Sequence, residues 1–340
     1  MKPIIVSFVI PTLNAQKTLK TCLNSIIKQK YPSSNYEIII ADGGSTDKTL
    51  SIAKIYKSKI YQNPLKTAEA GKAVGVKKAI GRYICLIDSD NILPQSNWLK
   101  KMLVPLEMDS QIIGSEPIKF TYRAKSGLFE RYSALIGAND PYAFITGVYD
   151  RKNMINNKWT GLKIDQIDKN KYIEIKLKPN TIIPTIGANG TIFRSNFLKK
   201  NLKSDYLFDI DIISQVLNQT QKSLTFAKVK IGMIHTFCES SLSKFIRKQK
   251  RRLIDYYSYK NLRQYDWSPI NQQSQIKFIL YTIFIIPSLI DSIRGFFKKP
   301  DSVWFLHPFF CLITLFIYGS ITIQQKIGLL KPVSRQNWHQ

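Results

Sequence analysis

The sequence contains few of the residues that build small, cross-linked or repetitive folds. Its four cysteines are scattered, with no CxxC pair, which excludes a zinc ribbon or a disulfide scaffold and favours a reducing compartment. With 16 glycines and 15 prolines in 340 residues, collagen-like and low-complexity chains are excluded as well. No internal repeat is visible. The chain opens on the strand-like run Ile4 to Ile10, which is too short for the apolar core of a secretory signal.

Acidic residues are also scarce: 23 Asp and Glu stand against 50 Lys and Arg, for a formal net charge of +27 at pH 7. A chain this basic suits anionic partners, namely nucleic acid, an acidic membrane surface or a phosphorylated substrate, and charge alone does not choose among them. Apolar residues are not scarce. They make up 44% of the chain, enough for a sizeable core, so wholesale disorder is excluded.

The first hundred residues alternate between strand-like and helical periodicity. Continuous apolar runs are typical of buried parallel strands, and amphipathic segments lie between them. The expected strands cover residues 4–10, 37–41, 59–62 and 83–87, and the expected helices cover 19–27, 45–55 and 68–80. This alternation predicts an α/β fold with a mostly parallel, doubly wound sheet flanked by helices.

Polar residues follow three of these strands. The turns are Pro11-Thr12-Leu13-Asn14, Asp42-Gly43-Gly44 and Asp88-Ser89-Asp90. Since the carboxyl ends of parallel strands share one edge of a sheet, these groups are expected to meet there, where nucleotides bind. Two carboxylates two residues apart can share a hard divalent cation whose other positions take water and phosphate. Each turn alone also fits an ordinary helix cap, but the combination favours a nucleotide site.

The segments Val9–Asn14, Ile40–Asp47 and Leu86–Asp90 resemble the successive motifs of the family-two inverting glycosyltransferases, which have the GT-A fold. The resemblance implies that this site holds a nucleoside-diphosphate sugar. The residues implied on the donor side are Pro11, Thr12, Asn14, Asp42, Gly43, Asp88, Ser89 and Asp90. Of these, Asp90 is the implied ligand of Mg²⁺ or Mn²⁺, and Asp88 would contact ribose or the same metal.

One departure lies at Gly71–Gly75, where the family often shows Ala-Arg-Asn-x-Gly. Lys72 is expected to replace the arginine near the diphosphate, and Ala73 lacks the asparagine contact.

The second half resembles the family more loosely. Gly187, Asn189 and Gly190 belong to a segment similar to the acceptor-side glycine loop. Asp209 and Asp211 stand where the family keeps a Glu-Asp motif, so either could be the general base for an acceptor hydroxyl. The alternative is that Asp209 only caps the following helix.

Two further features could contact the acceptor or the diphosphate. His235 ends an apolar run, at a place where family members often approach the diphosphate or metal; a structural role is the alternative. Gln249, Arg251 and Arg252 resemble the Gln-x-x-Arg-Trp motif of processive relatives, with Leu253 where Trp would stand, which argues against a processive synthase. This basic, helical-looking stretch, 243–257, could also bind anionic lipid or simply face solvent.

The C-terminal part contains two apolar segments. Residues 276–290 would make roughly 22 Å of helix and residues 303–323 roughly 31 Å, against a hydrocarbon core of ~30 Å. Because basic residues flank both segments, the positive-inside rule gives no clean two-span topology. The sequence favours a membrane hairpin, or one span beside an in-plane helix; buried core helices are the alternative.

We therefore expect a membrane-attached glycosyltransferase with its catalytic domain on the cytoplasmic face. The expected parts are a nucleotide-sugar-binding half (1–110), an acceptor-binding and catalytic half (111–265) and a membrane-associated helical tail (266–340). The expected partners are a nucleoside-diphosphate sugar, a saccharide or lipid-linked acceptor and anionic membrane lipid, but not nucleic acid.

Three alternatives remain open. A polyprenyl-phosphate sugar transferase would need no base, because its acceptor is already ionised. A nucleotidyltransferase would want a glycine-rich phosphate loop after the first strand, and Pro11–Asn14 is not one. A non-enzymatic basic module on membrane or nucleic acid would explain the charge but not the three polar turns, and the chain lacks a nucleic-acid motif.

Overall fold

The computed structural model describes residues 3–260 and 272–330. Its strands are β1 Val6–Thr12, β2 Tyr36–Asp42, β3 Lys59–Gln62, β4 Tyr83–Leu86, β5 Asn91–Ile92, β6 Ile112–Phe120, β7 Asp165–Asp168, β8 Tyr172–Leu177, β9 Thr191–Arg194 and β10 Leu224–His235. Its α-helices are α1 Leu19–Ile27, α2 Thr49–Ile55, α3 Ala68–Lys78, α4 Trp98–Met108, α5 Leu128–Ile136, α6 Pro141–Thr146, α7 Ser195–Asn201, α8 Asp209–Thr220, α9 Leu242–Ser258, α10 Gln272–Ile283, α11 Ile286–Lys298 and α12 His307–Lys326. Short 3-10 helices lie at η1 Ser33–Asn35 and η3 Ser302–Leu306.

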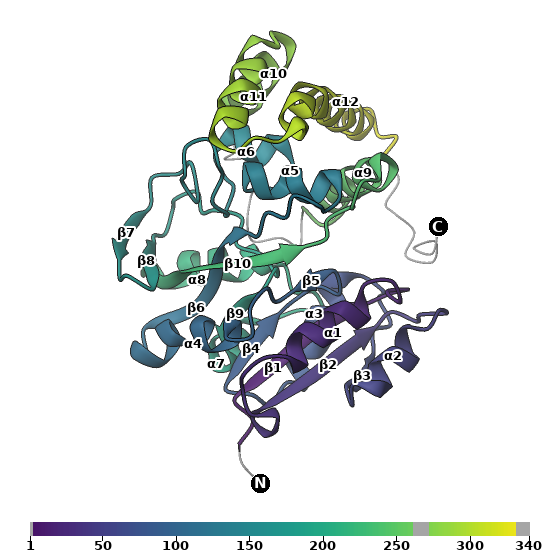
Figure 1. Cartoon of the computed structure of the whole chain (residues 1–340), viewed down its shortest axis with the longest axis vertical. Coiled ribbons are helices and arrows are strands. Elements are labelled where there is room, and N and C mark those ends of the chain that lie inside the picture. The colour runs from purple at the N-terminus through teal and green to yellow at the C-terminus, as the bar shows by residue number, and fades with distance from the viewer. Residues whose placement is uncertain (1–2, 261–271, 331–340) are drawn as a thin grey trace.

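One sheet runs through the protein in the order β3-β2-β1-β4-β9-β6-β10-β8-β7, with β5 paired to β10 (Figure 1). The first four strands are parallel, as the sequence predicts. Beyond β4 the sheet is mixed, because β9 pairs antiparallel with both β4 and β6. The sheet therefore continues across residue 110, so the two expected halves share it. The expected boundary at 265–266 lies outside the described residues.

The parallel strands are buried on both faces, which explains their unbroken apolar runs. Successive residues of β1 point to opposite cores. Phe8 and Ile10 pack in the core formed with α1, α2 and α4, and Val9 packs in the core formed with α3, α7 and α8. The helix α3 approaches β1 so closely that a Cβ at Gly75 would lie 2.3 Å from Val9 Cγ1. The expected α/β architecture is confirmed.

Element boundaries shift by small amounts from the sequence prediction. The helix expected from residue 45 begins at Thr49, because Asp47 Oδ1 accepts hydrogen bonds from the Thr49 backbone N–H and hydroxyl. The polar stretch 149–180 contains the antiparallel pair β7 and β8.

The C-terminal helices pack on the rest of the protein at the end far from the N-terminus (Figure 1). A third core joins α5 and α9 to the tail, where the Phe129 ring stacks on Phe245 and contacts Phe310. The apolar run 276–290 is not one helix: α10 and α11 meet at an 80° bend. Among the described residues, Ser302–Lys326 is the single unbent helix long and apolar enough to cross a membrane, with a mean hydropathy of 1.8.

Candidate functional site

A cleft of about 1420 Å³ lies at the carboxyl ends of β1 and β4. It brings together most of the residues that the sequence analysis singled out. The predicted residues that line it are Pro11, Thr12, Asn14, Lys72, Asp88, Ser89, Asp90, Gly187, Asn189, Asp209, His235, Arg251 and Arg252. The predicted residues that do not line it are Asp42, Gly43, Gly190, Asp211 and Gln249. The motifs predicted for donor and acceptor, which are far apart in the chain, therefore share one cavity.

Asp42 is buried and shapes the loop beside the cleft. One carboxylate oxygen accepts hydrogen bonds from the hydroxyls of Thr12 (2.8 Å) and Ser45 (2.6 Å). The other accepts from the backbone N–H groups of Gly44 (2.9 Å) and Ser45 (2.8 Å). Both oxygens are thus engaged within the protein, and Asp42 fastens the loop after β2 to the end of β1.

Asp90 lies between two basic side chains. His235 Nε2 is 3.5 Å from Asp90 Oδ1, and Lys248 Nζ is 3.4 Å from Asp90 Oδ2. His235 reaches this position because the antiparallel pair β5–β10 sets it opposite Asn91, and the Thr236 backbone N–H donates to the Asp90 carbonyl. Burial alone would raise the pKa of Asp90, but the charges of His235 and Lys248 more than offset it and hold that pKa well below its usual value.

Asp88 is buried in a different electrostatic setting. Burial raises the pKa of its carboxyl, the charge of Lys72 opposes this rise, and the charge of Asp90 adds to it. Asp88 Oδ1 and His235 Nδ1 are buried without a hydrogen-bond partner among the described residues. Buried polar atoms of this kind indicate a missing ligand.

The cleft residues near Asp90 would bind a divalent cation only together with ligands supplied by a substrate. No group of three His, Cys, Asp or Glu side chains in the described ranges is arranged to hold a metal by itself. Asp88, Asp90 and His235 all line the cleft, and Mg²⁺ normally takes its remaining ligands from phosphates and water.

Asp209, not Asp211, faces the cleft. It occupies the first turn of α8 and pairs with Lys72 of α3, with 3.0 Å between Lys72 Nζ and Asp209 Oδ2. Burial raises the pKa of Asp209 to about 6, against the lowering effect of Lys72. Its second oxygen, Oδ1, is buried without a hydrogen-bond partner in the described part of the chain. Asp211 is also buried but does not line the cavity.

The basic helix α9 supplies Lys248, Arg251 and Arg252 to the lining of the cleft, whereas Gln249 of the predicted motif lies outside it. Gln249 is buried, donates to the Asn139 carbonyl and accepts from Tyr318 Oη of α12 at 3.1 Å. Arg252 pairs with Asp140 at the start of α6. Gln249 and Arg252 therefore fasten α9 to its neighbours, and Lys248 contacts Asp90. No local motif marks Lys248 among the many basic residues of this helix.

A buried charge cluster below the acceptor loop was missed by the sequence analysis. Glu116 of β6 pairs with Lys228 of β10 and, at 2.7 Å, with Arg151. Glu116 Oε1 also accepts from the Gly187 backbone N–H, and Arg151 Nη2 donates to the Asn189 carbonyl. The cluster thus fixes the glycine loop. A charged residue in the middle of an apolar strand, as at both 116 and 228, is the sequence signal that could have revealed it.

The fourth member of the cluster, Asp150, lines the cleft. Burial raises its pKa to about 7, and the charge of Arg151 opposes the rise. Burial likewise lowers the pKa of Lys228, whereas Arg151 and Lys228 keep the pKa of Glu116 below its usual value against the effect of burial.

The architecture and the cavity define a class. An open sheet with acidic turns at the carboxyl ends of neighbouring parallel strands is typical of α/β proteins that bind nucleotides. Residues 7–126 match the model of the family described as Glycosyl transferase family 2.

Curated proteins match part of the chain. Glycosyltransferase AglE of Haloferax volcanii is 26% identical over 135 residues, which are 38% of this chain and 44% of that protein. A dolichyl N-acetyl-alpha-D-glucosaminyl phosphate 3-beta-D-2,3-diacetamido-2,3-dideoxy-beta-D-glucuronosyltransferase of Methanococcus voltae is 35% identical over 102 residues, 28% of this chain and 32% of that protein. The matched segments span less than half of each relative's own length.

Solved structures superpose loosely on most of the chain. TarS 1–349 of S. aureus in complex with UDP has a TM-score of 0.45 at 16% identity, covering 96% of this chain and 92% of that one. The mannosyltransferase PcManGT from Pyrobaculum calidifontis, in complex with GDP-Man and Mn²⁺, has a TM-score of 0.48 at 11% identity, covering 94% and 89%.

Proposed function

We propose that this protein is an inverting glycosyltransferase that moves a sugar from a nucleoside-diphosphate donor to an acceptor hydroxyl. The observation that carries the proposal is the convergence of Asp88, Asp90, Lys72 and Asp209 in one cleft, in a chain whose residues 7–126 match the model of Glycosyl transferase family 2. These are the groups that such a reaction needs: acids and cations for the diphosphate, and a buried carboxylate for the acceptor.

On the donor side, the nucleoside lies over the turn Pro11–Asn14, with the loop that Asp42 holds in place beside it. Asp90, with Asp88 and His235, would hold Mg²⁺ or Mn²⁺, which supplies charge neutralisation for the departing diphosphate. Lys72 and Lys248 are within reach of the same region and add fixed positive charge where the negative charge develops.

On the acceptor side, Asp209 acts as the general base. With its pKa raised to about 6, it is mostly ionised at neutral pH and still accepts a proton readily. Its Oδ1 takes the proton of the acceptor hydroxyl, the acceptor oxygen bonds to the anomeric carbon, and the bond from that carbon to the diphosphate breaks. The nucleoside diphosphate leaves with the bonding electrons. The glycine loop Gly187–Gly190, fixed by Glu116 and Arg151, holds the acceptor.

The acceptor is a saccharide or a lipid-linked molecule, and the lining of the cleft favours the second. The cavity continues past α9 to side chains of the tail helices, among them Phe278, Ile279, Leu315 and Ile323. Apolar lining of this kind suits a hydrocarbon chain. We also propose that the protein is attached to the cytoplasmic face of a membrane through the tail.

A polyprenyl-phosphate transferase is the second candidate, and the basic side chains of α9 favour it. Arg247, Lys250 and Arg251 line the same cleft as the carboxylates and the apolar side chains, and the phosphate of such an acceptor would lie against them.

A panel of nucleotide sugars tests the donor. Ligands that bind the folded state raise its thermal stability by mass action, so one sugar nucleotide should stabilise the protein selectively, more strongly with Mn²⁺ than without. The selected donor is then assayed for release of its nucleoside diphosphate with a lipid-linked and a free saccharide acceptor. No stabilisation and no release with any donor would contradict the proposal.

A further inference from the structure

Helix α12 has two sides of opposite character. Side chains spaced three, four or seven residues apart lie on one side of a helix. The outward side carries Phe309, Leu312, Phe316 and Ile323, which are 49%, 43%, 77% and 60% exposed. The inward side carries Phe310, Thr314, Ile317 and Ile321, all buried against the protein. An outward side without a polar residue at these positions is unusual for a helix that faces water.

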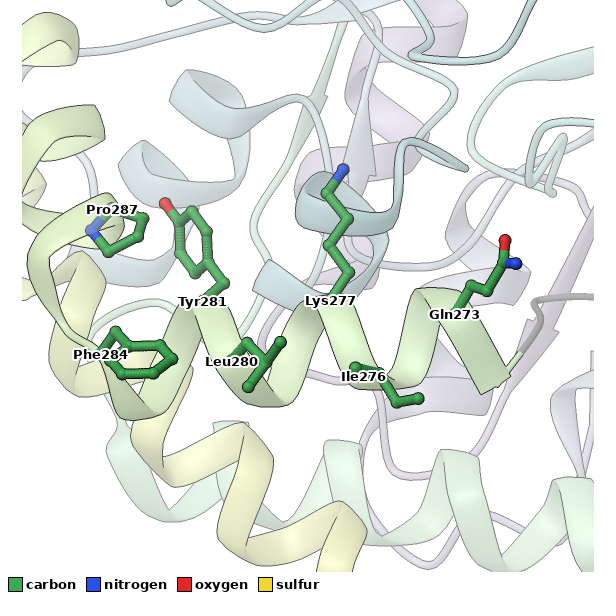
Figure 2. A pocket seen from close by; sticks show the side chains of 7 residues that line it. All are labelled: Gln273, Ile276, Lys277, Leu280, Tyr281, Phe284 and Pro287. Atoms are coloured by element: carbon green, nitrogen blue, oxygen red, sulfur yellow. The ribbon is translucent and has the colours of Figure 1, made fainter.

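The helices α10 and α11 repeat this pattern. On α11 the small residues Ser288, Ser292 and Gly295 are buried, and a Cβ at Gly295 would lie 2.5 Å from the Trp304 ring. The outward residues of α11, together with Ile285 just before the helix, are between 41% and 80% exposed. On α11 they are Ile286, Leu289, Ile290, Ile293 and Phe297. Figure 2 shows Ile276, Leu280 and Phe284 in a row along one side of α10, with Tyr281 and Lys277 on the other. These residues line a shallow apolar pocket of about 600 Å³.

Helix α12 cannot leave the protein to cross a bilayer, because α9 runs beside it. The rings of Phe245 and Phe310 lie 5.9 Å apart, and Tyr257 Oη bonds to Thr322 Oγ1 at 3.0 Å. These contacts extend over roughly 18 Å of α12. Along the same stretch α9 carries a series of lysines and arginines, including Arg247 and Arg251. A spanning α12 would draw these charges to membrane depth, which is costly.

The charges around the apolar faces are mainly basic. The described tail contains Lys277, Arg294, Lys298, Lys299 and Lys326. Its two acids are engaged: Asp291 accepts from Tyr281 Oη, and Asp301 pairs with Arg131. A basic rim around an apolar surface matches the outer layer of an anionic membrane, which holds lysine and arginine side chains at its surface.

We propose that α10, α11 and α12 together form a docking surface that lies in the plane of the membrane and enters one leaflet of an anionic bilayer, with α12 not crossing it. This deepens the proposed membrane attachment and is independent of glycosyl transfer. Because Ile279 and Ile323 also line the cleft, the docked enzyme would open its acceptor site toward the lipid.

Depth measurements separate this arrangement from a span. The full-length chain is bound to phosphatidylcholine–phosphatidylglycerol vesicles with an environment-sensitive fluorophore at Phe305→Cys, Phe316→Cys or Ile327→Cys. The four native cysteines are buried and leave the label specific. Nitroxide lipids quenching near the headgroup or near the chain end then report depth. Docking in the plane gives the same shallow depth at all three sites. A span would place positions 305 and 327 ~33 Å apart, at opposite surfaces, and would overturn the inference.

Charge substitution identifies the surface. Phe297→Glu/Phe316→Glu should weaken vesicle binding by roughly tenfold or more, since binding follows the apolar area that enters the lipid. The matched control is Ile55→Glu/Met108→Glu, at apolar residues 76% and 72% exposed outside the tail, which should bind as the unmodified chain does. Circular dichroism confirms that each variant is folded.

The remaining outcomes are distinct. The unmodified chain could instead bind no vesicles and form a dimer that Phe316→Glu abolishes. In that case a second copy of the chain covers the docking surface, and both the membrane attachment and the docking mode are wrong. Vesicle binding with a spanning depth profile would contradict the docking mode alone. Neither result bears on sugar transfer, which is measured separately on a soluble acceptor.

Discussion

The parallel end of the sheet and the C-terminal tail use apolar side chains in opposite ways. Every residue of β1 is buried, and the polar side chains Thr12 and Asn14 reach the cleft where the strand ends. In the tail, large side chains such as Phe297 and Phe316 are 80% and 77% exposed, whereas Ser292 and Thr314 are buried. Apolar segments thus have two different roles in this protein. Those of the sheet are buried and keep water out of the core beside a polar site, whereas those of the tail form an exposed apolar surface.

The largest expected effect concerns Asp90, a cleft carboxylate that follows the buried strand β4. Asp90→Ala should reduce transfer to background, because it removes the carboxylate that His235 and Lys248 surround. Thermal unfolding should change little. Steady-state kinetics with the selected donor measure the effect. Asp165→Ala, an exposed acid of β7 paired with Lys178, is the control and should keep full activity. Full activity of Asp90→Ala with an undiminished requirement for Mn²⁺ would contradict the assignment.

The next prediction concerns Asp209, the buried carboxylate that we propose as the general base. Asp209→Asn should lower the turnover rate by ~10²–10⁴-fold, the usual contribution of a positioned base, with donor binding unchanged. Because the pKa of Asp209 is about 6, the activity of the unmodified enzyme should fall as pH drops through 6. Replacing Lys72, which lowers that pKa, should move this fall to higher pH.

Asp211→Asn is the matched control and should be near normal. If neither variant loses even about tenfold, a hydroxyl acceptor activated by these residues is wrong, and the polyprenyl-phosphate reaction becomes the better candidate.

Lys228→Met tests the charge that the mixed part of the sheet buries. Removing one partner leaves Glu116 incompletely compensated, which typically costs about 3–5 kcal/mol of the free energy of unfolding. Chemical denaturation measures this loss. Lys230→Met, two residues along β10 on an exposed side chain, should be close to neutral. Because Glu116 also holds Gly187, any folded Lys228→Met protein should show a raised KM for the acceptor rather than for the donor. Equal stability of the two variants would contradict a stabilising role for the buried charge cluster.

The smallest expected effects concern two glycines, one in α3 beside the sheet and one in α12 of the tail. Gly75→Ala places a Cβ 2.3 Å from Val9, and such overpacking typically costs about 1–3 kcal/mol. At Gly319 of α12, a Cβ would meet no atom within 4 Å, so Gly319→Ala should be neutral or stabilising by up to about 1 kcal/mol through helix propensity. Thermal melts of both variants measure the difference, and the opposite order would mean that α3 can move away from β1.

The parallel part of the fold was predictable because its signals are local. An apolar run that ends in Pro11, Asp42 or Asp88 contains both the strand and its end in a few residues. The choice between Asp209 and Asp211 was not predictable. It depends on how α8 is rotated and on Lys72 of a distant helix.

Non-local pairings account for the rest. Glu116 and Lys228 meet only because β6 and β10 are neighbours in the sheet. Likewise, His235 reaches Asp90 through the short pair β5–β10. The bend after α10 did carry a local signal, since Pro287 stands in the first turn of α11, but the apolar run around it reads as continuous. Which side of the tail helices faces outward requires their packing on α5, α6 and α9.

The place of β9 in the sheet also has a consequence during synthesis. β4 pairs on one side with β1 and on the other with β9, which emerges from the ribosome about 100 residues later. At ~5–20 residues per second, the edge of β4 stays open for roughly 5–20 s. The nascent chain therefore holds a short parallel sheet whose apolar edge strand Tyr83–Leu86 has no neighbour, and unpaired edges of this kind bind other strands. Synonymous changes that slow translation between residues 87 and 190 should lower the yield of soluble protein without altering a single side chain.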